Sequence, residues 1–202
     1  MFTVELKGID EAIKRHDPKR VIAAARQAIN RTADSTRTEA SRAIREEYNI
    51  KPAKINERLK VEKKAGGNDL TAVIVAKGKG LPLTDFDAKQ EGVIVNQKGF
   101  RYTRKAGRIG NLRHGGVLTA IIKTASGRKE VPGKYGNKPF LTHLKKSGKP
   151  VVWERTGKDR MSLKTRFGPG AAILFGSEKI MERIKRYALD KLQAEFKRLL
   201  DL

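Results

Sequence analysis

Two carboxylates spaced two residues apart, Asp85 and Asp87, are the first candidates for chemistry in this sequence. Such a pair could hold a metal ion as a nuclease site does, with Glu91 as a further acid. The charge of the surrounding sequence is positive, however, which does not favour a metal site. We therefore favour a turn, or a contact with a neighbouring arginine, over an enzyme that uses these three acids.

The three histidines, His16, His114 and His143, have no His, Asp or Glu partner at metal-ligand spacing on a common face. His16 precedes Asp17, but that pair opens a predicted helix, where capping is the expected use of the aspartate. His143 lies in a run with alternate apolar positions, and we expect it to face solvent or a neighbouring subunit. The chain has no cysteine nucleophile and no Gly-x-Ser-x-Gly motif. The sequence therefore predicts neither a catalytic site nor a metal site.

Two glycine-rich basic stretches, at residues 77–80 (KGKG) and 107–110 (GRIG), are candidates for phosphate-binding loops. Both lack the Gly-Lys-Ser/Thr ending of a nucleotide-binding loop, and neither leads clearly into a helix. We expect no cofactor.

Basic residues interleaved with Phe100 and Tyr102 fill the stretch from 101 to 113. This composition suits contact with a phosphate backbone, with some stacking of bases on the aromatic rings. A solvated loop or a contact with an acidic subunit is the alternative, and it stays open. No motif for sequence-specific recognition is present. The predicted residues for contact with nucleic acid or an acidic partner are Lys77, Lys79, Arg101, Arg104, Lys105, Arg108 and Arg113.

The formal net charge of +23 is concentrated in the middle of the 202-residue chain. Residues 1–50 hold 10 Lys and Arg against 8 Asp and Glu, and residues 171–202 hold 7 against 5. Residues 51–170 hold 28 against 9. Solubility alone does not require such segregation. The expected neighbour is a polyanion or an acidic protein surface.

The composition also bears on the compartment in which the protein assembles. No run approaches the roughly 20 apolar residues of a membrane span, so we expect no contact with a membrane. The N-terminus lacks the basic start and apolar block of a signal peptide. The absence of cysteine excludes disulfides, cysteine zinc sites and iron–sulfur clusters, and it fits assembly in a reducing cytoplasm.

Two long amphipathic helices are predicted near the ends of the chain. Asp17-Pro18 starts a helix of about 30 residues that reaches Tyr48, and its buried stripe is rich in Ala and Thr. Such a stripe buries little area per residue, so this helix needs a partner surface. A second short helix is predicted over Pro52–Leu59. Ser177, as N-cap, starts the C-terminal helix, with Glu178 in its first turn.

Between the helices the chain changes to short β-branched strands joined by long basic loops. Strands are predicted at residues 1–8, 70–76, 93–95, 117–122 and 151–153. The loops at 97–115 and 123–138 are long for a compact domain, so we expect them to order only against a neighbour or nucleic acid.

The resulting fold class is α+β, with long N-terminal and C-terminal amphipathic helices bracketing a β-rich, loop-rich basic centre. We expect a single domain over residues 1–202, with a strand and helices at 1–60, the basic β-rich region at 61–170 and the C-terminal helix at 171–202.

Several stretches resemble the minor tail protein Z family of long-tailed bacteriophages and their prophages. Residues 28–33 (AINRTA), followed by the segment 50–59, are similar to the opening of that family. Residues 139–148 (PFLTHLKKSG) resemble its Phe-x-x-x-Leu-Lys-x-Gly pattern, and 152–160 (VWERTGKDR) its Arg-x-x-Gly-Lys-x-Arg stretch. The Gly-Pro at 168–169, before the last helix, is also similar to phage neck and tail-completion proteins.

The resemblance implies a non-enzymatic structural protein of the virion, located at the head-proximal end of the tail and assembled in the host cytoplasm. Such proteins act in tail completion and head–tail joining, usually as rings, with a hexamer favoured. The expected partners are the tail terminator and head-completion proteins, with phage DNA in the channel as a further contact. The alternative is a non-sequence-specific DNA-binding protein of nucleoid or ribosomal type. We expect the subunit interface to include Ala25, Ile29, Ala33, Phe140 and Trp153.

Overall fold

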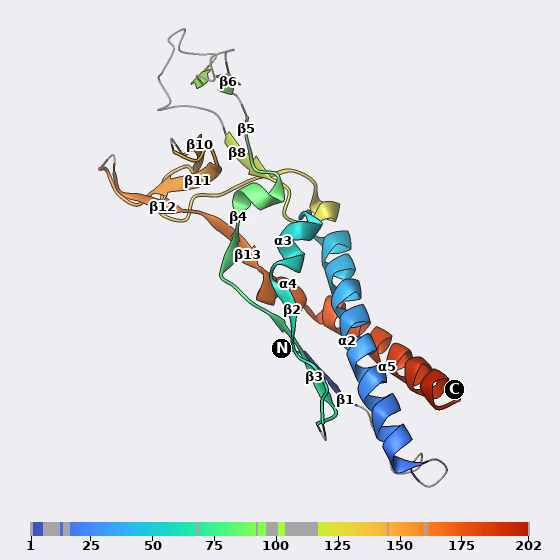
Figure 1. Cartoon of the computed structure of the whole chain (residues 1–202). Helices are drawn as coiled ribbons and strands as arrows, with labels where there is room; N and C mark the ends of the chain where they lie inside the picture. Colours follow the sequence, from blue (N-terminus) through green and yellow to red (C-terminus); the bar gives the residue numbers. More distant parts are fainter. Residues whose placement is uncertain are drawn as a thin grey trace. The chain divides into compact units, whose positions relative to one another are not determined.

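The computed structural model describes residues 2–5, 13, 17–67, 69–91, 93–95, 101–103, 117–144, 146–159 and 161–201. Long helices and many short strands confirm the predicted α+β class (Figure 1). The chain divides into two compact units. Unit 1 comprises Met1–Glu46, Pro52–Lys79 and Gly170–Leu202, and unit 2 comprises Glu47–Lys51 and Gly80–Pro169.

Two long helices, α2 (Pro18–Glu47) and α5 (Glu178–Leu200), lie side by side in unit 1 (Figure 1). The start of α2 is the predicted one, because the Asp17 carboxylate accepts a hydrogen bond from the Lys19 backbone N–H at 3.4 Å. Ser177 occupies the predicted N-cap position of α5, but its hydroxyl makes no capping hydrogen bond. Glu178 lies in the first turn of α5, as expected.

A three-stranded antiparallel sheet completes unit 1, with the order β1 (Phe2–Glu5), β3 (Thr71–Ala76), β2 (Leu59–Lys63). Two short helices contact this sheet: α3 (Pro52–Asn56) contacts β2, and α4 (Ala171–Phe175) contacts β3. The predicted helix over Pro52–Leu59 is therefore too long by three residues. Leu59 is instead the first, fully buried residue of β2, paired with Ala76.

The partner surface that α2 requires lies within unit 1. The guanidinium of Arg37 donates to the Leu59 carbonyl at 2.8 Å, which ties α2 to β2. The Asn30 amide exchanges two hydrogen bonds with the backbone of Ala65, at 3.0 and 2.8 Å. The small residues of the helix are thereby buried against the chain itself, as the Ala-rich stripe requires.

Unit 2 is built from short strands. One sheet has the order β10-β11-β12, a second β5-β8-β9, and two pairs join β13 with β4 and β6 with β7. The bounds are β4 Gly80–Pro82, β5 Lys89–Glu91, β6 Val93–Val95, β7 Arg101–Thr103, β8 Val117–Ala120, β9 Lys129–Glu130, β10 Phe140–His143, β11 Pro150–Arg155, β12 Leu163–Thr165 and β13 Phe167–Gly170, with 3-10 turns η1 Leu83–Phe86 and η3 Thr124–Ser126.

The core of unit 2 is small. It gathers Leu83, Leu118, Ala120, Val131 and Val152, with smaller contributions from neighbouring strands. Val152 alternates with outward-facing neighbours along β11, so only one face of the β10-β11-β12 sheet covers this core.

The segment 123–138 differs from its prediction. It contains η3 and β9, which pairs with β8, and its backbone reaches the side chain of Glu154. The expectation that it orders only against a partner is therefore wrong. The loop at 97–115 lies almost entirely outside the described residues. Within the described part of the chain, no helix is both long and apolar enough to cross a membrane.

Candidate functional site

Asp87 ends the 3-10 turn η1 and has a left-handed backbone, with φ 53° and ψ 47°. Arg128 donates to its backbone carbonyl at 2.9 Å and also to its carboxylate. The Lys89 ammonium lies 3.5 Å from the same carboxylate. The predicted turn and arginine contact are confirmed for Asp87. No cluster of three His, Asp or Glu able to hold a metal occurs among the described residues.

The residues predicted to contact nucleic acid are not brought together by the described part of the chain. Lys77, which follows β3, forms an ion pair with Glu62 of β2, and Lys79 is exposed. Arg101 lies in β7 opposite Val95, and its side chain is not described. The remaining predicted residues, Arg104, Lys105, Arg108 and Arg113, lie outside the described residues, as do His16 and His114. This contact surface stays a prediction.

The residues predicted for the subunit interface fall into two groups. Ala25, Ile29 and Ala33 are fully buried within unit 1, where the chain itself covers them. Phe140 and Trp153 are half-buried and lie directly opposite each other on β10 and β11. His143 on the same strand is exposed, as expected. Only the aromatic pair offers partly free surface for another subunit.

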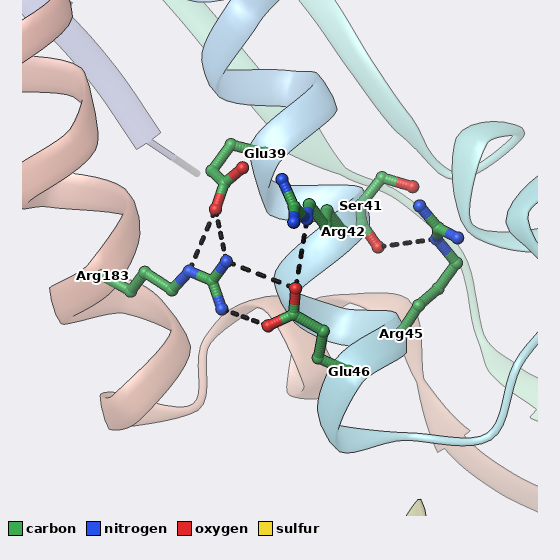
Figure 2. Close-up of polar contacts among 6 residues, drawn as sticks. All are labelled: Glu39, Ser41, Arg42, Arg45, Glu46 and Arg183. Atoms are coloured by element: carbon green, nitrogen blue, oxygen red, sulfur yellow. Dashed lines mark hydrogen bonds and ion pairs between the residues drawn. The ribbon is translucent and has the colours of Figure 1, made fainter.

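The densest polar cluster of unit 1 surrounds Arg183 of α5 (Figure 2). Its Nε and Nη2 donate to Glu39 Oε1 at 2.9 and 2.6 Å, and Nη1 donates to Glu46. Arg42 donates to the same Glu46 carboxylate at 3.1 Å. The hydrogen bond from Arg183 is the main cause of a lowered pKa for Glu46, and Glu46 in turn raises the pKa of Arg183. The cluster joins α5 to α2 and has the character of a structural clamp.

A second cluster joins the same helices at the other end of α5. Glu195 accepts from Arg198 at 2.9 Å, and Lys191 and Arg31 lie 3.2 and 3.5 Å from its carboxylate. The hydrogen bonds from Arg198 and then Lys191 lower the pKa of Glu195 to about 2. These contacts show that α2 and α5 run antiparallel, because Glu195 contacts the first half of α2 and Arg183 contacts its second half. Each of the two helices still carries more positive than negative charge, with 7 Lys and Arg against 4 Asp and Glu.

A different arrangement occurs in unit 2, around the fully buried carboxylate of Glu154. Its Oε1 accepts a hydrogen bond from the backbone N–H of Tyr135, 19 residues earlier. Its Oε2 lies 3.2 Å from Nε of Arg166, whose side chain is only 15% exposed. Arg166 also donates from Nη2 to the Pro132 carbonyl at 3.2 Å. One buried ion pair thus holds the start of this loop at Pro132 and its middle at Tyr135.

Glycines allow this loop to turn tightly. A Cβ on Gly133 would lie 2.3 Å from the carbonyl oxygen of Asn137, so no larger residue fits there. Gly136 has a φ of 80°, a region that side chains disfavour. The Asn137 amide donates to the Arg155 carbonyl at 3.0 Å, which attaches the far end of the loop to β11. The loop is long and exposed, yet its backbone is fixed at several points.

Tyr135 is 38% exposed, and two ammonium groups lie near its ring. Lys164 Nζ lies 5.2 Å from the ring centroid and Lys134 Nζ 5.9 Å from it, both within cation–π range. Among the described residues, neither lysine forms an ion pair with a carboxylate. We call Lys134, Tyr135 and Lys164 the Tyr135 surface.

Comparison with known proteins adds one decisive observation. The family model described as prophage minor tail protein Z (GPZ) matches residues 6–202, nearly the whole chain. The chain belongs to this family. The protein is thus a phage minor tail protein with a structural role in the tail of the virion. No curated protein and no solved structure matches this minor tail protein.

The Tyr135 surface was not among the residues predicted from the sequence of this minor tail protein. Residues 131–169 hold 10 Lys and Arg against 2 Asp and Glu, and one of those two acids is the buried Glu154. Asp159 is the other, and it is exposed. The sequence signal was available in 132–138 (PGKYGNK), which interleaves lysine with an aromatic residue as the stretch 101–113 does.

Proposed function

We propose that this minor tail protein acts in tail completion and head–tail joining at the head-proximal end of the tail. The observation that carries the proposal is the family match over residues 6–202. The neighbours in this proposal are the tail terminator and head-completion proteins, and the protein's place is the virion.

We further propose a ring of identical subunits, with a hexamer favoured. The aromatic pair Phe140 and Trp153 supports a subunit interface, because aromatic residues are enriched in such contacts. Val151 and Leu163 are also half-buried and lie on the same face of the β10-β11-β12 sheet, which faces away from the unit 2 core. A head-to-tail contact through this face closes into a ring when the rotation between neighbours is that of a closed symmetry.

The charge of unit 2 supports a contact with DNA in the channel of such a ring. Its 95 residues hold 21 Lys and Arg against 7 Asp and Glu, a net charge of +14. The predicted residues from Arg101 to Arg113 belong to this unit. In a ring, the binding of one copy to DNA holds the other copies close to the same DNA. Their weak contacts therefore form at a high effective concentration and add to the total affinity.

The proposal is tested by deleting the protein from a phage that encodes it. We expect heads and tails to accumulate unjoined, or tails of abnormal length, in electron micrographs of the lysate. Expression in trans should restore joined particles, and the protein should be detected in purified virions. Its absence from purified virions would contradict the proposal outright.

The alternative, a DNA-binding protein of nucleoid or ribosomal type, rests on the net charge of +23. It predicts tight binding of duplex DNA by the isolated chain near physiological salt, weakening steeply as salt rises. The tail proposal predicts that the isolated chain binds DNA measurably only at low salt. A salt titration with purified protein separates the two.

We also propose that the protein has no enzymatic activity. The arginine contact of Asp87 gives this acid a structural use. The double variant Asp85→Asn/Asp87→Asn tests the remaining nuclease hypothesis. We expect particles with unchanged infectivity from the variant phage, whereas a loss of infectivity with normal assembly would revive an enzymatic role.

A further inference from the structure

We propose that the Tyr135 surface binds the sugar-phosphate backbone of DNA, with one phosphate at each of the ammonium groups of Lys134 and Lys164. The inference deepens the proposed contact with DNA and rests on it for the identity of the polyanion in the virion. It assigns the contact to a described surface 20 or more residues away from the predicted stretch 101–113.

The first argument is the lack of competing negative charge. Elsewhere in the chain, lysines form ion pairs with carboxylates. The pairs are Lys63 with Asp69, Lys64 with Asp34, and Lys191 with Glu195. Among the described residues from 131 to 169, Arg166 and Glu154 form the only ion pair, and this pair is buried. The ammonium groups of the Tyr135 surface are therefore available to an external anion.

The second argument is preorganisation. An exposed loop pays a large entropic cost when it orders on binding, which weakens the affinity. Here the buried Glu154 already holds the Tyr135 backbone, and Arg166 holds the Pro132 carbonyl. Lys164 comes from β12, a strand, so its backbone is also fixed. Both cations reach the same tyrosine ring without further rearrangement of the backbone.

The third argument concerns the class of partner. Protein interfaces need an apolar, desolvated centre. The Tyr135 surface has two lysines, which act as point charges for phosphate oxygens, and residues 132–138 around it are all exposed. Its aromatic ring could also stack on an unpaired base, which an acidic peptide cannot offer. These features favour nucleic acid over an acidic protein.

The test measures binding of the full chain to a labelled DNA duplex of about 20 base pairs by fluorescence anisotropy, starting near 50 mM salt. The variant Lys134→Gln/Lys164→Gln removes both cations of the surface. The matched control Lys146→Gln/Lys149→Gln removes the same charge from the exposed β10–β11 connection of the same unit. Circular dichroism checks that every variant folds.

We expect the surface variant to weaken binding about tenfold and to lower the slope of log affinity against log salt by about 2. The control should change the affinity less than about twofold. Equal effects of the two variants would show that only the overall charge matters, and would overturn the proposal.

Tyr135 provides a second, independent measurement on a single-stranded oligonucleotide. Replacing Tyr135 by Leu should weaken binding of the single strand about tenfold, whereas Tyr135→Phe, which keeps the ring, should bind as the parent does. If polyglutamate of equal charge competes as well as DNA and Tyr135→Leu has no effect, the surface binds acidic protein and the proposal fails.

These outcomes are independent of the proposed place in the tail. Should the protein be absent from virions while the lysine pair still controls DNA binding, only the tail proposal fails. If instead the protein is present in virions and the two lysine variants have equal effects on DNA binding, the tail proposal stands. Only the proposed DNA contact of the Tyr135 surface then fails.

Discussion

Trp153 of β11 lies directly opposite Phe140 of β10, and Thr165 of β12 lies on the other side of Trp153. The guanidinium of Arg155 sits 5.6 Å from the centroid of the Phe140 ring, on the same face of the sheet. The opposite face carries Val152 and Glu154 into the interior of unit 2. The outer face therefore presents a row of half-buried aromatic and aliphatic groups, which is more apolar than an outward sheet face needs to be.

Replacing Trp153 by Thr should dissociate the proposed ring, because it removes the largest apolar group of this face while threonine still suits a strand. Native mass spectrometry should show the parent as the larger species and the variant as smaller ones. Trp153 is the sole tryptophan, so its emission should also shift to shorter wavelength as the parent assembles with rising concentration. Leu144→Ser, a change at a 40% exposed residue beyond the strand, serves as the control. Unchanged mass of the Trp153 variant would exclude this face from the interface.

The Arg183 clamp predicts a loss of stability when its arginine is replaced by Gln. The Arg183 side chain is 42% exposed, so the free energy of unfolding should fall by only about 1 kcal/mol, which is less than the loss expected for a buried ion pair. Thermal unfolding should shift down by about 2–4 °C. Arg186→Gln is the control, since Arg186 is an exposed arginine of the same helix without an ion pair in the described part of the chain. Equal shifts for both variants would mean that the clamp adds nothing.

The two long helices were predictable from the sequence because their signals are local. The pair Asp17-Pro18 fixes the start of α2, and small and apolar residues at helical spacing continue it for 30 residues. The β-branched run within Thr71–Ala76 likewise predicts β3. Elements of three residues, such as β4 and β12, have too few positions to show a hydrophobic period.

The Tyr135 loop could not be predicted in the same way, because its anchor is a tertiary contact. Glu154 alternates with half-buried neighbours along β11, and only the position of Arg166 explains why a carboxylate is tolerated inside. The sequence shows a glycine- and lysine-rich segment, which resembles a loop that needs a partner. Similarly, the burial of Ala25 by the chain's own elements depends on how unit 1 packs.

Glu195 predicts an acid-dependent loss of stability in unit 1. Its pKa in the folded chain is about 2, against 4.5 for an unperturbed glutamate, chiefly because of hydrogen bonds from Arg198 and Lys191. A lowered folded pKa stabilises the fold above pH 4.5, and this contribution is lost as the pH falls from 4.5 towards 2. The lowered pKa values of Glu46 and Asp69 act in the same direction.

Urea unfolding of the parent and of Glu195→Gln, measured from neutral pH to pH 2, checks this prediction. The parent should be the more stable protein at neutral pH, and the difference should disappear across that acidic range. Glu182→Gln, at an exposed position of the same helix, should differ little from the parent throughout. A difference that does not depend on pH would refute the role of the ionised carboxylate.

Glu154 gives the prediction that links stability to the Tyr135 surface. Replacing Glu154 by Leu leaves the Arg166 charge and the Tyr135 N–H without their buried partner, so unit 2 should lose about 3 kcal/mol of unfolding free energy. Adding Arg166→Met should recover part of that loss, because it removes the uncompensated charge. Hydrogen exchange of the Tyr135 amide should accelerate in the single variant. Unchanged exchange would show that the carboxylate does not hold the loop.

The same substitution separates two explanations of DNA binding by opposite signs. Glu154→Leu removes a negative charge and raises the net charge from +23, so binding governed by overall charge should tighten. Binding that needs a positioned Tyr135 surface should weaken, because the loop carrying Lys134 loses its anchor. The measurement is the anisotropy titration at a temperature where circular dichroism shows the variant folded. Tighter binding by the variant would refute preorganisation of the loop as a source of affinity.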